Sequence, residues 1–242
     1  MPSWLAVLVS SADEHPGVLI SRKALRKVGP FTNADYPAWE WTCRAVLAGE
    51  AVLWDSPGAD EYPPQLPALA PSSPDRESRW LAPLLKSSLE GLCGRMASKH
   101  DALALHAGIL QLHDDLDGSH ELSQSIEGLG RRHAGDYWHA IMHCREGDFG
   151  NAKYWRRRVG RHALFEDLAP IANEILAKCT SPAAPAWRAK VVGGGWNPNA
   201  FIDLCETCVR GRDADLTRAA EELQFAEMHL LLAATYEDAV GG

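Results

Sequence analysis

Apolar side chains recur at helical spacing along most of the chain after residue 76, and this pattern limits the fold more than any other feature. Glycine, proline and capping residues interrupt the pattern at intervals that are typical of helix ends. Because short connections join neighbouring helices antiparallel, we expect a mainly α protein built of stacked helical hairpins. The sequence predicts helices over residues 78–100, 101–116, 121–129, 137–146, 149–159, 164–179, 199–210 and 215–237.

Local signals predict how some of these helices begin and where one long loop lies. Ser119 and Asp136 precede apolar helical runs and are expected N-caps, because their oxygens can accept a hydrogen bond from a free backbone amide. Residues 181–199 contain prolines and the glycine run 193–195, so we expect a flexible loop anchored by Trp196 that could cover the site. The glycine run lacks the lysine and hydroxyl residue of a phosphate loop.

Composition divides the chain into three parts. Residues 1–56 combine short β-branched runs with two helical patterns and predict a small α+β unit. Residues 57–75 are rich in proline, which disfavours helix and central strand, so we expect an extended linker and a domain boundary. Residues 76–242 form the predicted helical domain.

Charge and cysteine content exclude several classes of protein. The 242-residue chain has a formal net charge of −8 and a pI of about 5.7, which argues against nucleic acid or anionic membranes as partners. No apolar run is long enough for a membrane span. Cys205 and Cys208 lack the second pair that a zinc site usually has, so we expect buried free thiols in a cytoplasmic protein.

Histidines are concentrated between residues 113 and 161, where we expect the functional site. His139 and His143 are four residues apart on one predicted helix, which places both imidazoles on one face. With His120, His113 or a carboxylate as third ligand, this face could bind a divalent transition metal such as zinc, copper or iron. Alternatively, these histidines are buried and hydrogen-bonded within the core.

The same block predicts a pocket for a small ligand, in which histidine acts as ligand or general base and carboxylates orient it. The candidate ligand-binding residues are His113, Asp114, His120, Tyr137, Lys153, Tyr154 and Arg157. A basic helix face could also bind a phosphate or carboxylate group, through Lys153, Arg156, Arg157, Arg158 and Arg161. The alternative is internal ion pairing of these side chains with Asp114, Asp115, Asp117 or Glu146.

Two classes of function therefore stay open. In the first, the helical domain is an enzyme or binding protein with a metal or small-molecule pocket lined by histidine and aspartate. In the second, it is a non-catalytic scaffold that binds a protein partner. Convergence of the histidines would favour the first class, and histidines that point apart would favour the second.

Three phrases within residues 113–165 are specific enough to resemble a known family. They read HDDLDGSHELSQ, DYWHAIMHCRE and NAKYWRRRVGRHALF. They resemble recurrent phrases of a family of helical bacterial and fungal proteins whose activity is not established, apart from Cys144, Arg156 and the pair at 163–164. This resemblance implies a domain type without a function.

Two shorter segments are similar to other helical families. Residues 137–159 resemble a single tetratricopeptide hairpin, with small Ala140 and Ala152 on either side of a Gly-Asp-Phe turn, which implies close packing of two helices. Residues 112–117, LHDDLD, resemble the first aspartate-rich motif of isoprenyl diphosphate synthases, which would imply magnesium–diphosphate binding on an all-α fold. The second aspartate-rich motif of that family has no counterpart in the later helices.

The N-terminal phrases GVLISRKALRKVGPF and WEWTCRAVLAGEAVLW, within residues 17–54, resemble the acceptor-side end of family-two glycosyltransferases. That family also needs a nucleotide-binding sheet and an Asp-x-Asp metal motif before this segment. Only 16 residues precede residue 17, so we expect a reused strand–helix unit packed on the helical domain.

Overall fold

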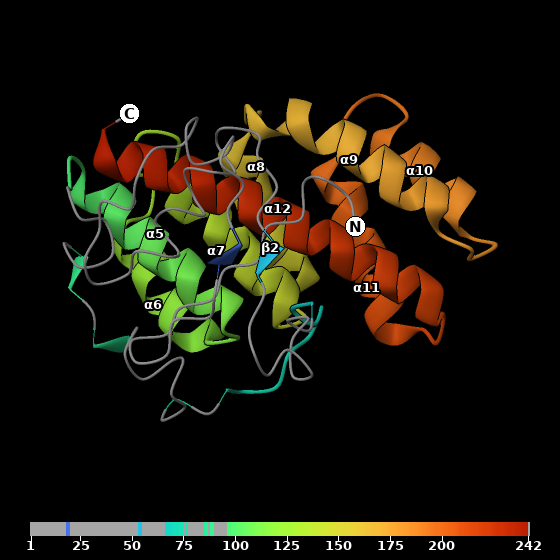
Figure 1. The fold of residues 1–242 in the computed structure, drawn as a ribbon, viewed down its shortest axis with the longest axis horizontal. Coiled ribbons are helices and arrows are strands. Elements are labelled where there is room, and N and C mark those ends of the chain that lie inside the picture. Colours follow the sequence, from blue (N-terminus) through green and yellow to red (C-terminus); the bar gives the residue numbers. More distant parts are fainter. Residues whose placement is uncertain are drawn as a thin grey trace.

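The computed structural model describes residues 18–19, 53–54, 66–74, 76, 85–86, 88–89 and 96–241. In these ranges the fold is mainly α, which confirms the predicted class (Figure 1). Strands β1 (Val18–Leu19) and β2 (Leu53–Trp54) pair antiparallel, with Val18 opposite Trp54. The rest of the predicted α+β unit lies outside the described residues. No described helix combines the length and apolar character that a membrane crossing needs.

Eight helices follow one another in the described part of the chain. They are α5 (Lys99–Leu112), α6 (Leu116–Ser125), α7 (Ala134–Arg145), α8 (Phe149–Val159), α9 (Leu164–Lys178), α10 (Ala184–Val192), α11 (Pro198–Arg210) and α12 (Ala214–Val240). The connections between them are short, as the hairpin prediction requires.

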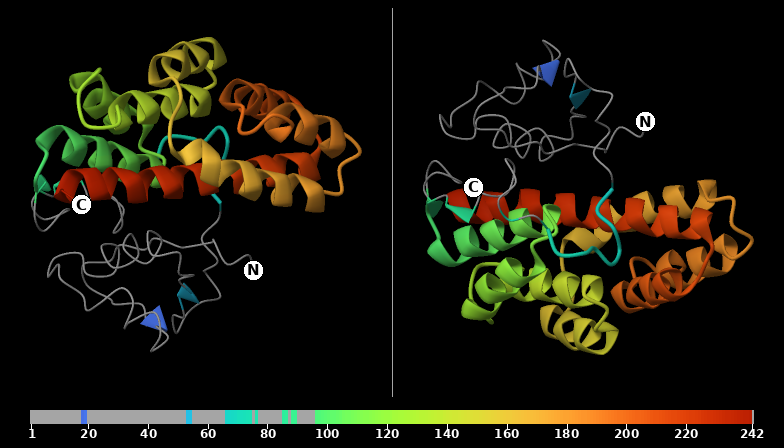
Figure 2. Two further views of the ribbon diagram at one scale, coloured as in Figure 1. Left: turned by 90° about the horizontal axis from the view of Figure 1, so that it is seen from above. Right: turned by 90° about the horizontal axis from the view of Figure 1, so that it is seen from below.

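Helix α12, with 27 residues, is the long central element of the fold. It packs against α5 and α9 in one layer, and α7 and α8 form part of a second layer (Figures 1 and 2). Tyr137 and Trp138 of α7 are fully buried between these layers. Gly108 of α5 allows this close contact, because a Cβ at that position would lie 2.4 Å from the Trp138 ring.

The start of α6 differs from the prediction. Asp115 is the N-cap, since its carboxylate accepts a hydrogen bond from the Gly118 amide at 3.3 Å. Ser119 is instead buried inside α6, where its hydroxyl accepts a hydrogen bond from Gln111 Nε2 at 3.0 Å. The predicted N-cap at Ser119 is therefore wrong, because Asp115 begins the helix one turn earlier.

The start of α7 differs in the same way. The N-cap position is held by His133 in a left-handed conformation, with φ of 53° and no side-chain cap bond. Asp136 lies in the first turn, where its carboxylate accepts a hydrogen bond from the Gly128 amide at 2.9 Å. The predicted cap at Asp136 is wrong, because this carboxylate ties α7 to the preceding loop.

The predicted loop over residues 181–199 and one predicted helix end are also wrong. Residues 181–199 contain helix α10, since proline is accommodated in the first turn, where the backbone amides have no partner within the helix. Trp196 follows the glycine run and is buried against Phe201, with ring centroids 5.1 Å apart. The predicted helix over 78–100 lies largely outside the described residues, but its predicted end is wrong, because Ser98 caps α5 and residues 99 and 100 belong to that next helix.

The described part of the predicted linker, residues 66–74, is not helical. Its first residues are held on the helical domain rather than free. Arg145 donates to the Ala68 carbonyl at 3.2 and 3.3 Å, and Gln224 donates to the carbonyls of Pro67 and Ala68 at 3.1 and 3.2 Å. Leu69 is 3% exposed and belongs to the hydrophobic core.

Candidate functional site

Three histidines from two helices converge on one side of α7. His139 and His143 project from the same face of α7, and their rings are stacked with centroids 4.7 Å apart. His120 of α6 meets both rings edge-on, at 4.8 Å from His139 and 5.4 Å from His143. One ring nitrogen from each lies within 4.8 Å of the others. We call His120, His139 and His143 the histidine triad.

His139 is the most buried member of the histidine triad, with 1% of its surface exposed. Its ring is stacked on Trp155 of α8 at a centroid distance of 3.9 Å. Its Nδ1 atom is buried and has no hydrogen-bond partner. Burial and, to a smaller degree, the neighbouring His143, His120 and Arg158 together lower the pKa of His139 to about 3. The imidazole is therefore neutral at pH 7 and keeps a free lone pair.

His143 has two polar neighbours, Glu146 and Asn151. Its Nδ1 atom lies 2.5 Å from the Glu146 carboxylate, which can only accept a hydrogen bond when it is ionised. Its Nε2 atom lies 3.0 Å from the side-chain nitrogen of Asn151, which is a donor. The same nitrogen lies 3.4 Å from Nδ1, so it sits over the face of the imidazole and not in line with the Nε2 lone pair.

A tight turn places α8 beside these rings. Helix α7 ends at Arg145, and Gly147 follows with a φ of 88°, a conformation that a residue without a Cβ adopts without strain. Asp148 then caps α8 by accepting a hydrogen bond from the Asn151 amide at 3.0 Å. Asn151 and Trp155 are four residues apart, so both side chains lie on the α8 face that meets α7.

The spacing of the triad fits a metal site that closes slightly on binding. Nitrogen ligands at about 2.0–2.1 Å from a tetrahedral ion lie about 3.3 Å from one another. The triad nitrogens lie within 4.8 Å, so rotations that move them by about 1.5 Å bring them into range. Glu146 and Asp148 form a second candidate group with His143, but both carboxylates are exposed to solvent.

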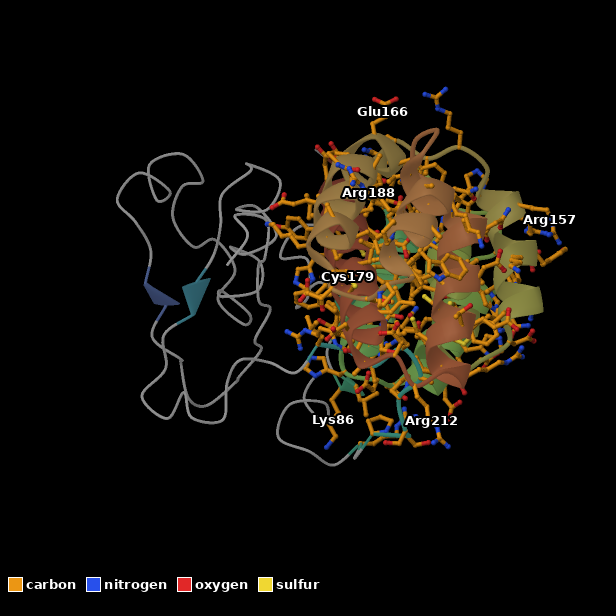
Figure 3. All side chains as sticks on the ribbon, turned by 90° about the vertical axis from the view of Figure 1, so that its right-hand side faces the viewer. Lys86, Arg157, Glu166, Cys179, Arg188 and Arg212 are labelled. Atoms are coloured by element: carbon orange, nitrogen blue, oxygen red, sulfur yellow. The ribbon has the colours of Figure 1, made fainter. Side chains whose placement is uncertain are left out.

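The structure places the other predicted ligand-binding residues against different partners. The Asp114 carboxylate lies 2.5 Å from the buried guanidinium of Arg145, next to His113 at the end of α5. Burial lowers the pKa of His113, while the charge of Asp114 opposes that effect. Lys153 forms an ion pair with Asp203 of α11. Tyr154 is exposed, and Arg157 points into solvent (Figure 3).

The basic residues of α8 do not form one anion-binding face. Arg156 is buried and paired with Glu227 of α12, which also accepts a hydrogen bond from the Tyr137 hydroxyl at 2.9 Å. Arg158 is paired with Glu127 at 2.8 Å. Internal ion pairs therefore exist, but in the described residues none of them uses the predicted partners Asp114, Asp115, Asp117 and Glu146. The Asp115 carboxylate lies 3.2 Å from Arg76 instead.

The Tyr137 environment is a buried polar cluster separate from the histidine triad. Burial raises the pKa of Tyr137, and the Arg156 guanidinium lies 3.9 Å above its ring. His162 meets the same ring edge-on at 5.1 Å. Burial lowers the pKa of His162 to about 4, with Arg132 and Arg156 adding to the effect. Glu227 links Tyr137 and Arg156, whereas Arg156 Nε and Nη1 and His162 Nε2 are buried without a hydrogen-bond partner.

The cysteines behave as expected from the sequence. Cys205 and Cys208 are free and buried, and neither belongs to a potential metal-ligand group within the part of the chain described. Burial raises the pKa of Cys208 to about 11, so the thiol is protonated and unreactive at neutral pH.

Sequence reasoning missed Glu146, Asn151 and Trp155 as neighbours of the histidines. The His143–Glu146 spacing of three residues was a usable signal, because such residues adjoin on a helix face. Asn151 and Trp155 depend on the angle at which α8 returns after the turn, which no local pattern gives.

No protein-family model, curated protein or solved structure matches this chain.

Proposed function

We propose that this protein binds a divalent transition metal ion through His120, His139 and His143. The observation that carries the proposal is the convergence of three imidazoles from α6 and α7, one of which has a buried nitrogen without a partner. A buried polar atom usually has a hydrogen-bond partner. Burying such an atom without a partner costs free energy, and a bound ligand would offset this cost. Neutral imidazole is a preferred ligand of zinc, copper, nickel and cobalt.

The surroundings support metal binding. Ligating histidines usually donate their second nitrogen to a carboxylate, which fixes the tautomer, and Glu146 stands in that position relative to His143. Trp155 and the helix packing shield His139 from water, which strengthens the attraction between an ion and its ligands.

The cellular setting is also a proposal. Free thiols at Cys144, Cys179, Cys205 and Cys208 fit a reducing compartment such as the cytoplasm. The acidic net charge of −8 supports a small ligand or a protein, rather than nucleic acid, as the further partner.

Metal titration of the full chain, purified without a histidine tag and treated with chelator, tests this function. We expect about one equivalent of Zn²⁺ or Co²⁺ to bind, measured by calorimetry and by metal analysis after dialysis. His120→Ala should weaken binding at least about tenfold, because His120 is half-buried and supplies one of three ligands. His100→Ala, at an exposed position on α5, is the matched control and should bind like wild type.

Two results would contradict the proposal. One is binding of less than about a tenth of an equivalent of any of Zn²⁺, Co²⁺, Ni²⁺ or Cu²⁺. The other is equal affinity in His120→Ala and His100→Ala. Either result favours the second class of function, a helical scaffold whose histidines serve packing.

A further inference from the structure

Helix α6 supplies one member of the histidine triad but lacks the apolar contacts that hold its neighbours. Among the eight described helices, only α6 buries no hydrophobic side chain, since its buried residues are Gly118, Ser119 and Ser123. Leu116 and Leu122 are only half-buried. In contrast, all twelve residues of α7 are buried. Because a surface helix is stabilised mainly by packing of its apolar face, α6 is held less firmly than α7.

Polar contacts of α6 do not replace this apolar packing. The Ser119 hydroxyl accepts a hydrogen bond from Gln111 Nε2, but that nitrogen also donates to the Trp138 carbonyl at 2.8 Å and keeps this partner if α6 moves. The Ser123 hydroxyl is buried without a partner, which makes the packed position less favourable. A helix of ten residues is also marginal by itself in water, where isolated helices need about 12–15 residues.

The segments at both ends of α6 are fixed more firmly than the helix itself. Asp115, its N-cap, forms an ion pair with Arg76 at 3.2 Å. Ile126, directly after the helix, is 1% exposed and belongs to the hydrophobic core. Local opening would therefore be confined to residues 116–125, and the fixed ends would return the helix to the same place.

An ion needs a path to the histidine triad, and α6 lies on that path. His139 is 1% exposed and His143 is 5% exposed, so solvent barely reaches either ring. The His120 ring of α6 meets both of them edge-on and is itself half-buried. Movement of α6 would take His120 away and uncover this side of the other two rings.

We propose that α6 is a metal-controlled lid, which opens in the metal-free protein to admit the ion and is held closed by His120 once the ion is bound. This inference rests on the proposed metal-binding function. Only closed α6 offers the third imidazole, so an ion binds the closed form more tightly. By linkage, the factor that His120 adds to metal affinity is also the factor by which the ion stabilises closed α6.

Hydrogen–deuterium exchange of the full chain, measured by mass spectrometry with and without Zn²⁺, tests this inference. In the metal-free protein we expect the amides of residues 116–125 to exchange faster than those of α7 and α12. Saturating Zn²⁺ should slow exchange in α6 at least about tenfold, which is the factor expected for His120 in the affinity. Exchange in α12 should change much less.

Three variants separate the effect of the ligand from the effect of the helix. His120→Ala should lose most of the slowing by Zn²⁺, even at saturation through the two other histidines. Gln124→Ala, an exposed position on α6, is the matched control and should keep it. Ser123→Ala removes the unpartnered hydroxyl and should slow exchange of metal-free α6 while leaving the ligands in place. Circular dichroism identifies any variant that fails to fold.

The outcomes distinguish failure of the lid from failure of the proposed function. If wild type binds no Zn²⁺, both proposals fail. If Zn²⁺ binds through His120 but metal-free α6 exchanges as slowly as α12, or if Zn²⁺ does not slow α6, the function stands and the lid is wrong. Equal slowing of α6 in His120→Ala and Gln124→Ala would also overturn the role of His120 in closing it.

Discussion

The buried histidines of this protein differ in which ring nitrogen has a hydrogen-bond partner. In His139 the buried Nδ1 is unpartnered, whereas in His162 Nδ1 accepts a hydrogen bond from the Leu164 amide at 3.3 Å. The sequence predicted that His139 and His143 share a helix face, because four-residue spacing fixes this locally. His113 and His120 both remained candidates for the third member, because local spacing does not show which of them lies near that face. The path of the chain from α5 into α6 brings His120 there.

His162 should make the fold less stable in mild acid. Its pKa of about 4 in the folded protein lies below the ordinary value of 6.5, so between these values the unfolded chain binds more protons. Stability should therefore fall as pH drops from about 6.5 to about 4, by up to about 3 kcal/mol from this group. Denaturant unfolding of wild type and His162→Asn across this range measures the effect.

Asparagine can keep the acceptor for Leu164 but does not titrate, so His162→Asn should show a flatter loss of stability with acid. His100→Ala, which changes an exposed histidine, is the control and should follow the wild-type curve. Parallel curves for wild type and His162→Asn would contradict the assignment.

At the level of helices, hydrophobic spacing was enough to predict most elements, and α8 has the bounds expected from the sequence. Predicted starts were less accurate, because Ser119 and Asp136 have the side chains of caps but bond to residues eight positions earlier, outside their own helices. The prolines around helix α10 favour a loop by composition, but proline in the first turn is compatible with a helix. Element type follows from periodicity, while boundaries depend on which polar group finds a tertiary partner.

Replacing each of two helical glycines by alanine should change the free energy of unfolding in opposite directions. Gly108→Ala places a Cβ 2.4 Å from Trp138 and 3.0 Å from Leu232, so we expect a loss of about 1–3 kcal/mol despite the better helix propensity of alanine. Gly150→Ala meets only Asp148, at 3.7 Å, and should gain up to about 1 kcal/mol. Urea unfolding of both variants measures the difference, and a stable Gly108→Ala would refute the close packing of α5 on Trp138.

Across the whole molecule, α12 collects polar partners from segments far apart in the sequence. Glu227 pairs with Arg156, Asp238 accepts from Arg132 at 2.6 Å, and Gln224 holds the chain near Pro67. The basic residues of α8 favour an anion site or pairs with nearby carboxylates when only the sequence is considered. The charge pattern along the chain carries no information about partners so far away. The class of fold could be predicted, but these cross-links could not.

Loss of one partner in the buried ion pair should be costly. Glu227→Gln leaves the Arg156 charge without a counter-ion in the core, so we expect a loss of about 3–5 kcal/mol in the free energy of unfolding. The triple variant Glu227→Leu, Arg156→Met and Tyr137→Phe removes the polar groups together and should recover most of that stability. If Glu227→Gln unfolds like wild type in urea, the pair is not desolvated.

The attachment of residues 66–69 determines where the chain can be cut. Proline content suggests a boundary at residues 75–76, yet a fragment starting there would lose the carbonyls that Arg145 and Gln224 use and the core side chain of Leu69. Buried donors without acceptors each cost about 1–3 kcal/mol. A fragment that keeps these contacts therefore begins at or before residue 66, and limited proteolysis should spare the bonds between residues 66 and 69.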